Sequence, residues 1–180
     1  MIVFVCGLSR SGKSHMLEAV LVNCTGVQHL RASELLRASG RPTALISAAD
    51  ALLNQEVFIA AAKAAIERTS DNIIIDGHLM IESADGPQLV PETCFDALPL
   101  VGMVVIEAPP TEIVRRHVEI EPALTADEAA DRMELERIHA RRIARRRNIG
   151  FAAVESGDVD HLYDELARMF GPEDRGRADR

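Results

Sequence analysis

The sequence predicts an α/β fold in which a five-stranded parallel sheet carries helices on both faces. Short apolar runs alternate with longer helical stretches along the chain. Two of the runs, at residues 73–75 and 104–106, are continuously apolar, which is typical of parallel strands covered on both faces. The first run leads directly into a glycine-bounded loop and then a helical stretch. Strands and helices that alternate in this way form three layers through right-handed crossovers.

Each predicted strand corresponds to one apolar run, and the predicted helices lie between the runs. The strands cover residues 2–6, 27–30, 72–76, 101–108 and 151–154. The helices cover residues 14–22, a short stretch within 31–50, and residues 47–68, 111–118, 125–147 and 160–170. Pro109 and Pro110 precede the helix at residues 111–118, and proline suits the first turn of a helix.

The helix at residues 47–68 has a start signal and an apolar face of its own. Ser47, with Asp50 three residues later, predicts the N-terminal cap. Leu52, Val57 and Ala60 or Ala61 recur at helical spacing, so they form the apolar face predicted for this helix.

Two long segments interrupt the alternation. Residues 31–50 hold a short helix and a polar Gly-Arg-Pro-Thr turn, and residues 77–100 form an insertion with turn signals at residues 85–87. Loops of this length in a compact domain are usually lids or binding loops. We expect one domain over residues 1–170 and a flexible, frayed tail at residues 171–180, which are rich in glycine, proline and charge.

Composition restricts the class of protein. With 180 residues, 47% of them hydrophobic, the chain can bury the core of one domain but is too short for two ordinary ones. The formal net charge of −8 argues against nucleic acid as a partner, because binding phosphates needs clustered positive charge. No apolar run approaches the length of a membrane span. Cys6, Cys24 and Cys94 lack a metal-ligand spacing, so we expect reduced cysteines in a cytoplasmic protein.

Residues 7–14 match the pattern G-x-x-x-x-G-K-[ST] between a strand and a helix, the context in which this pattern binds phosphate. The loop must wrap a polyphosphate with its backbone N–H groups, which excludes bulky side chains at Gly7 and Gly12. The phosphates then lie at a helix N-terminus, where the helix dipole favours negative charge. Lys13 is predicted to reach the β- and γ-phosphates, and Ser14 to bind Mg²⁺. The predicted cofactors are therefore ATP and Mg²⁺.

Two polar residues mark the end of the third predicted strand. Asp76 ends an apolar run, so its carboxyl group would lie in the ligand crevice of an open α/β sheet. Such an acid holds a Mg²⁺-ligand water or positions the nucleophile, although a turn aspartate would also follow a strand. His78 would point into the same crevice, or would pack as an ordinary loop residue.

Arginines follow the fourth predicted strand. Arg115 and Arg116 could stack on a base or reach phosphate, and one of the two could instead lie on a solvated helix face. Farther along, Arg137 shares a helix face with Arg141, whereas residues 142 and 146 share another, so only one set can face inward. Most of these charges are predicted to be paired at the surface. The predicted partners are Glu128, Glu134 and Glu136.

The short helix after the second strand carries polar groups that could contact an acceptor substrate. They are Ser33, Glu34 and Arg37. In a small-molecule kinase such groups would face the acceptor, and a plain amphipathic helix is the alternative.

Together these motifs resemble the archaeal-type adenylate kinases and their bacterial AAA relatives, which are small P-loop proteins of the nucleotide-kinase kind. The resemblance extends to about Val154, and its most specific part is the strand end Asp76-Gly77-His78 with the insertion that follows. The other matching segments are residues 7–14, 85–91 and 104–109, the last leading into Arg115 and Arg116. The resemblance implies a five-stranded parallel sheet, an acceptor-binding helical segment, a Gly- and Pro-containing hairpin and a short lid.

The lid and acceptor segments depart from that family. Family lids carry further arginines, whereas this chain has the acidic Glu119 and Glu121 at that place. Residues 31–34 read Arg-Ala-Ser-Glu where adenylate kinases carry a Gly-Asp pair. Arg137 does fall where the family has an arginine after the lid. We therefore expect ATP to be bound and AMP to be a weak acceptor or none.

The leading hypothesis is a cytoplasmic, ATP-dependent phosphotransferase that acts on a small acceptor, such as a nucleotide, a nucleoside or a metabolite. Its predicted catalytic residues are Lys13, Asp76 and Arg137, its metal ligands are Ser14 and Asp76, and its acceptor-binding residues are Ser33, Arg37 and His78. Its predicted nucleotide-binding residues are Gly7, Leu8, Ser9, Arg10, Ser11, Gly12, Lys13, Ser14, His15 and Arg115. The alternative is an ATP-dependent switch or adaptor with slow hydrolysis and no small-molecule acceptor.

Overall fold

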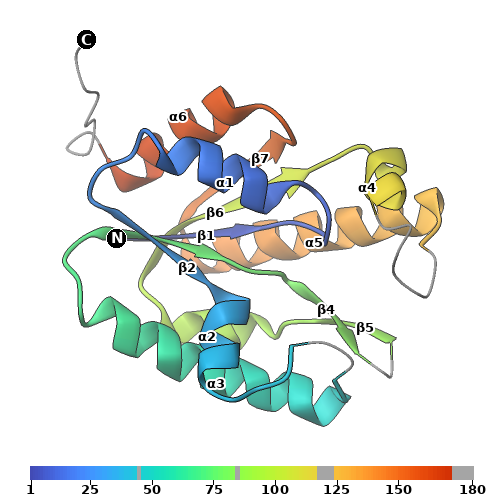
Figure 1. The fold of residues 1–180 in the computed structure, drawn as a ribbon, viewed down its shortest axis with the longest axis horizontal. Coiled ribbons are helices and arrows are strands. Elements are labelled where there is room, and N and C mark those ends of the chain that lie inside the picture. The colour runs from blue at the N-terminus through green and yellow to red at the C-terminus, as the bar shows by residue number, and fades with distance from the viewer. Residues whose placement is uncertain (44–45, 84–85, 117–123, 172–180) are drawn as a thin grey trace.

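The computed structural model describes residues 1–43, 46–83, 86–116 and 124–171. Its central sheet has five parallel strands in the order β2-β3-β1-β6-β7 (Figure 1). The strands are β1 (Ile2–Cys6), β2 (Val27–Arg31), β3 (Asn72–Asp76), β6 (Leu100–Glu107) and β7 (Gly150–Glu155). The predicted fold class is therefore confirmed, and each predicted strand is present to within a few residues.

Helices cover both faces of the sheet, which completes the three predicted layers (Figure 1). One face packs against α1 (Lys13–Leu21) and α6 (Val159–Phe170). The other face packs against α3 (Ala48–Ile66) and α5 (Ala126–Arg147). Two shorter helices, α2 (Ala32–Ala38) and α4 (Pro110–Arg116), follow β2 and β6. The last residues of the predicted helix at 111–118 and the acidic stretch with Glu119 and Glu121 lie outside the described residues, as does nearly all of the predicted tail.

The core is divided by the sheet because successive strand residues point to opposite faces. Val3 and Val5 pack toward α1 and α6, whereas Phe4 packs toward the other face. The Phe4 ring meets Phe95 edge to face, with 5.1 Å between ring centroids. Strands that are buried on both faces read as unbroken apolar runs, which is why the sequence identified them.

The buried face of α3 is not the predicted one. Its buried residues are Ala51, Asn54, Phe58 and Ala62, whereas Leu52 is 58% exposed. This helix has apolar residues on nearly every side, so spacing alone does not define a face, and the bulky Phe58 ring packs into the core instead. The predicted cap is confirmed, because the Asp50 N–H donates to Ser47 Oγ at 3.1 Å.

The insertion after β3 folds into a small structure of its own. β4 (Met80–Ser83) and β5 (Gly86–Leu89) form an antiparallel hairpin, and a 3₁₀ helix, η1 (Glu92–Ala97), follows. The hairpin that the resemblance implied is therefore present. Figure 1 shows it projecting beyond the carboxyl end of β3, at the same end of the sheet as the loop between β1 and α1.

Candidate active site

The loop between β1 and α1 has the backbone that a phosphate-binding loop needs. Gly7 and Gly12 have φ values of 155° and 88°, which L side chains rarely adopt. A Cβ atom on Gly7 would lie 2.6 Å from the Ile106 carbonyl oxygen, and one on Gly12 would lie 2.7 Å from Ser156 Oγ. No larger residue fits either position, so the loop keeps its backbone N–H groups accessible to an anion at the start of α1.

Lys13 and Asp76 form an ion pair beside this loop, with each side chain only 6% exposed. β3 pairs with β1 so that Asp76 stands opposite Val5, directly before the loop. Ser14 Oγ lies 3.5 Å from Asp76 Oδ2. The structure thus brings together the three residues for which the sequence predicted the γ-phosphate and Mg²⁺ contacts.

The surroundings of Asp76 keep its carboxyl group ionised. Burial alone would raise its pKa, but the neighbouring His29, the Lys13 ammonium and His78 together lower the pKa to about 2. His29 Nε2 lies 3.7 Å from Asp76 Oδ2. His29 was not among the predicted site residues. Its position near the carboxyl end of β2, the strand next to β3, was the signal that could have identified it.

His78 is attached to the first glycine of the loop. Its Nδ1 lies 2.8 Å from the Gly7 carbonyl oxygen, and because a carbonyl oxygen only accepts, the ring must donate from Nδ1. Desolvation by the surrounding atoms and the Lys13 ammonium lower the pKa of His78 to about 4, although the ring is still accessible to solvent. A neutral ring that donates from Nδ1 has an unprotonated Nε2, which can accept a proton.

Glu136 also belongs to this site, and its predicted surface pairing is wrong. Its side chain is 1% exposed, and its Oε1 accepts the Leu79 N–H at 2.9 Å. Burial raises the pKa of Glu136 to about 7, against the opposing effects of the Leu79 N–H, the Lys13 charge and the Gly7 N–H. The sequence did contain a signal for the burial of Glu136. It shares one helix face with Ala140 and Ile143, both of which are fully buried.

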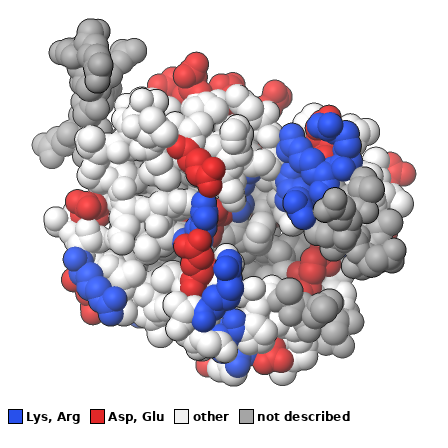
Figure 2. Space-filling view, viewed as in Figure 1, with Lys and Arg blue, Asp and Glu red and all other residues white. Residues whose placement is uncertain are grey.

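The arginine that contacts the loop is Arg116. Its Nη1 donates to the Arg10 carbonyl oxygen at 3.1 Å and would lie 3.3 Å from a Cβ on Gly12. Arg115 is 71% exposed and pairs with Glu112 at 2.6 Å. Figure 2 shows basic side chains gathered over α4, beside a hollow in the surface.

The arginines of α5 are mostly paired, as predicted, but with other partners in several cases. Arg137 lies 3.6 Å from Glu107 and also pairs with Glu134. Arg141 lies over the Phe151 ring, 5.1 Å from its centroid. The remaining pairs are Arg132 with Glu82, Arg142 with Glu92, and Arg146 with Asp96.

The two acceptor-binding residues predicted on α2 contact each other. Arg37 Nη2 donates to Ser33 Oγ at 3.2 Å on the exposed side of the helix. In the described part of the chain, neither residue has a hydrogen bond to Asp76 or His78. Arg31, at the start of α2, pairs with Glu18 and Glu34, and Figure 2 shows acidic and basic side chains alternating across α1 and α2.

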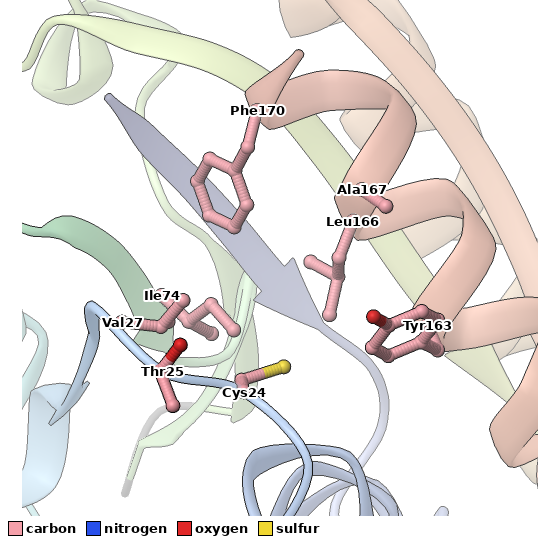
Figure 3. A pocket seen from close by; sticks show the side chains of 8 residues that line it. All are labelled: Cys24, Thr25, Val27, Ile74, Tyr163, Leu166, Ala167 and Phe170. Carbon is pink, nitrogen blue, oxygen red and sulfur yellow. The ribbon is translucent and has the colours of Figure 1, made fainter. Parts of the chain in front are cut away.

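The remaining features of the structure bear on cofactors and cavities. Within residues 1–171, leaving aside the undescribed gaps, no group of three or more His, Cys, Asp or Glu side chains could hold a metal ion, and no helix there is long and apolar enough to cross a membrane. Figure 3 shows an apolar pocket between α6, the segment that leads into the amino end of β2, and Ile74 in the middle of β3. Its lining residues are Cys24, Thr25, Val27, Ile74, Tyr163, Leu166, Ala167 and Phe170.

Comparison with known proteins places the chain in a family. Residues 6–134, most of the chain, match the family AAA_17, described as an AAA domain. No curated protein matches the chain. The tunicamycin resistance protein of Deinococcus radiodurans has a similar structure, with a TM-score of 0.62, 13% identity, and coverage of 94% of this chain and 95% of that one. A sugar kinase from a Janibacter species, in its unliganded form, has a TM-score of 0.58, 14% identity, and coverage of 94% and 93%. The chain therefore belongs to the AAA_17 family of AAA domains, and its fold is P-loop kinase-like.

Proposed function

We propose that the protein is a phosphotransferase that moves the γ-phosphoryl group of Mg·ATP onto a hydroxyl group of a small acceptor. The observation that carries this proposal is the buried Lys13–Asp76 pair beside Ser14, at the point where β3 ends next to the phosphate-binding loop. One of the two similar structures supports it, since that protein is described as a sugar kinase. Both similarities concern the fold, so the acceptor must be argued from the site.

The residues present fit ATP and Mg²⁺. Gly7 and Gly12 leave a cradle that a Cβ atom would fill, and Ser11 Oγ is buried without a hydrogen-bond partner among the described residues. Bound Mg²⁺ would neutralise charge on the phosphates, and Ser14 and Asp76 are the oxygen ligands at hand. The whole nucleotide site would comprise residues 7–15 with Arg115, and we include Arg116 because it contacts the Arg10 carbonyl oxygen.

Each catalytic residue has a role that follows from its charge. When ATP binds, Lys13 would leave its pair with Asp76 and bind the phosphates, where it would stabilise the charge of the transferring group. Asp76 stays ionised at neutral pH, as a metal ligand must. Arg137 is the predicted further cation, and to act it must give up its pairs with Glu107 and Glu134.

The charges near the hairpin and α2 favour an acceptor with little negative charge of its own. Three arginines there already have carboxylate partners, Arg31 with Glu34, Arg41 with Asp50, and Arg132 with Glu82, whereas Arg37 contacts Ser33. A phosphorylated acceptor would have to displace these partners, whereas a neutral hydroxyl compound would not. His78 Nε2 would accept the hydroxyl proton or hold the hydroxyl group, and Ser33 and Arg37 would contact the rest of the molecule.

An ATP-dependent switch with slow hydrolysis is the second candidate, and the pairing of Arg137 favours it. With Arg137 held by two carboxylates, the described site has one cation fewer for the transferring group. A cation at this place is worth about a thousandfold or more in rate. For either function we propose a cytoplasmic setting, in which the thiols of Cys6, Cys24 and Cys94 would stay reduced.

A panel of acceptors separates the two candidates. Purified protein is incubated with Mg·ATP and single nucleosides, nucleotides, sugars or hydroxylated metabolites, and ADP formation and phosphorylated product are measured together. A kinase shows rapid ATP loss and one phosphorylated product with one class of acceptor. Slow loss with every compound contradicts our proposal and supports the switch. Lys63→Met is a matched control for Lys13→Met, because these are the only lysines and Lys63 is exposed.

A further inference from the structure

One face of α5 makes polar contacts at several points along the insertion that comes after β3. We call this set of polar contacts the α5 stripe. Its members recur at intervals of three or four residues, which places them on one side of a helix. The contacts are Arg132 with Glu82, Glu136 with Leu79, His139 with Val90, Arg142 with Glu92, and Arg146 with Asp96.

The centre of the α5 stripe holds the base of the β4–β5 hairpin. Leu79 and Val90 close that base, since the Val90 N–H donates to the Leu79 carbonyl oxygen at 2.8 Å. The Leu79 N–H donates to Glu136 Oε1 at 2.9 Å, and His139 Nε2 donates to the Val90 carbonyl oxygen at 2.7 Å. Both strands of the hairpin are therefore attached to α5 through main-chain groups.

Glu136 also faces the phosphate-binding loop. Burial raises the pKa of Glu136, and the Lys13 ammonium and the Gly7 N–H oppose that effect. His78, which directly precedes Leu79, donates to the Gly7 carbonyl oxygen. Gly7 is thus joined to residue 78 through the His78 ring, and the adjacent Leu79 N–H is held by Glu136.

A buried carboxyl group at this place destabilises the folded state unless its contacts compensate for the lost hydration. Glu136 is 1% exposed, and its Oε2 has no hydrogen-bond partner among the described residues. Replacing such a group with an apolar side chain of similar size often stabilises a protein. Packing alone would therefore favour leucine or methionine at position 136, whereas only an oxygen acceptor can hold the Leu79 N–H.

We propose that Glu136 is a positioning residue, which fixes the base of the β4–β5 hairpin relative to the phosphate-binding loop. The proposal rests on the proposed function in one respect, namely that this hairpin borders the acceptor. The titratable groups that interact electrostatically with Glu136 are Cys6 from β1 and Lys13 from α1. Lys13 also pairs with Asp76, while His78 and His139 bind the Gly7 and Val90 carbonyl oxygens.

Hydrogen exchange of the Leu79 amide, followed by NMR in nucleotide-free protein, tests the proposal. In Glu136→Ala this amide should exchange about tenfold faster or more, the factor expected for loss of a hydrogen bond to a charged acceptor. Glu136→Gln keeps an acceptor oxygen and should restore most of the protection. Asp131→Asn removes a charge from the exposed side of α5 and should change nothing.

The pH dependence of the same exchange gives a second readout. In the wild type, protection of the Leu79 amide should rise as the Glu136 carboxyl ionises around pH 7, because an ionised acceptor binds an N–H more strongly. In Glu136→Gln protection should not vary with pH in this range. Unchanged exchange in Glu136→Ala overturns the proposal, and so does equally faster exchange throughout β1, β3 and β6, which would indicate global destabilisation. A failed acceptor panel leaves these exchange rates as they are, so the two proposals fail separately.

Discussion

Substitution of Lys13 by methionine should destabilise the protein even without nucleotide. Asp76 is 6% exposed, and its pKa is lowered from the ordinary 3.8 to about 2. At 1.36 kcal/mol per unit, this difference corresponds to about 2 kcal/mol of unfolding free energy at neutral pH. Because the folded pKa is depressed, that contribution is present above pH 3.8 and is lost as the pH falls through about 2.

Without Lys13, burial becomes the dominant influence on Asp76 and raises its pKa. Removal of one partner from a buried ion pair typically costs about 3–5 kcal/mol, and we expect about 3 because His29 stays close to the carboxylate. The loss should be smaller at pH 4 than at pH 7, since the unpaired carboxyl can then take up a proton. The double variant Lys13→Met/Asp76→Asn, which removes both charges of this pair, should be more stable than Lys13→Met.

Urea denaturation followed by circular dichroism, at pH 4 and pH 7, measures these differences, with Lys63→Met as the exposed control. A loss below about 1 kcal/mol in Lys13→Met, the range of an exposed pair, would refute the inference that this pair is buried and matters for stability. An equal loss at both pH values would refute the assignment of the effect to the Asp76 charge. In the same variant, affinity for ATP should be lost, because the loop would lose the lysine that is predicted to reach the β- and γ-phosphates.

Three further outcomes are expected. Asp76→Asn should keep the fold but lower Mg²⁺-dependent turnover, since the amide keeps the shape and loses the charge; unchanged rates across a Mg²⁺ titration would make Asp76 a turn residue. Gly77→Ala should cost about 1–3 kcal/mol in a urea titration, because its Cβ would lie 2.6 Å from the Phe4 ring, and Phe4→Leu should recover part of the loss. AMP should be a poor acceptor, and ADP formation in steady state at about 1–100 s⁻¹ would contradict this expectation.

The sequence was informative where contacts are local or where a pattern carries its own geometry. The backbone conformation of residues 7–14 depends on glycines within the segment itself. Strands that are buried on both faces stand out as apolar runs. Asp76 followed from its place at a strand end, because parallel strands direct their carboxyl ends to one edge of the sheet.

The sequence failed where a side chain is defined by a partner far along the chain. Glu136 looks like a surface charge among arginines, and only the Leu79 amide, 57 residues away, explains its burial. His29 depends in the same way on Asp76, on a neighbouring strand. Arg115 and Arg116 are adjacent, so the choice of which one meets the loop is set by the direction of α4 and not by residue type.

The attachment of the hairpin to α5 through main-chain atoms affects how this protein can change in evolution and in the laboratory. The Leu79 N–H and the Val90 carbonyl oxygen are present whatever side chains occupy the hairpin, so the two central attachments place few demands on the sequence between them. Side chains of β4 and β5 can therefore vary while the hairpin keeps its place beside the phosphate-binding loop. In the proposed function this hairpin borders the acceptor, so its position is kept by main-chain contacts while its side chains can change, and substitutions within it are where new acceptor preferences should be sought.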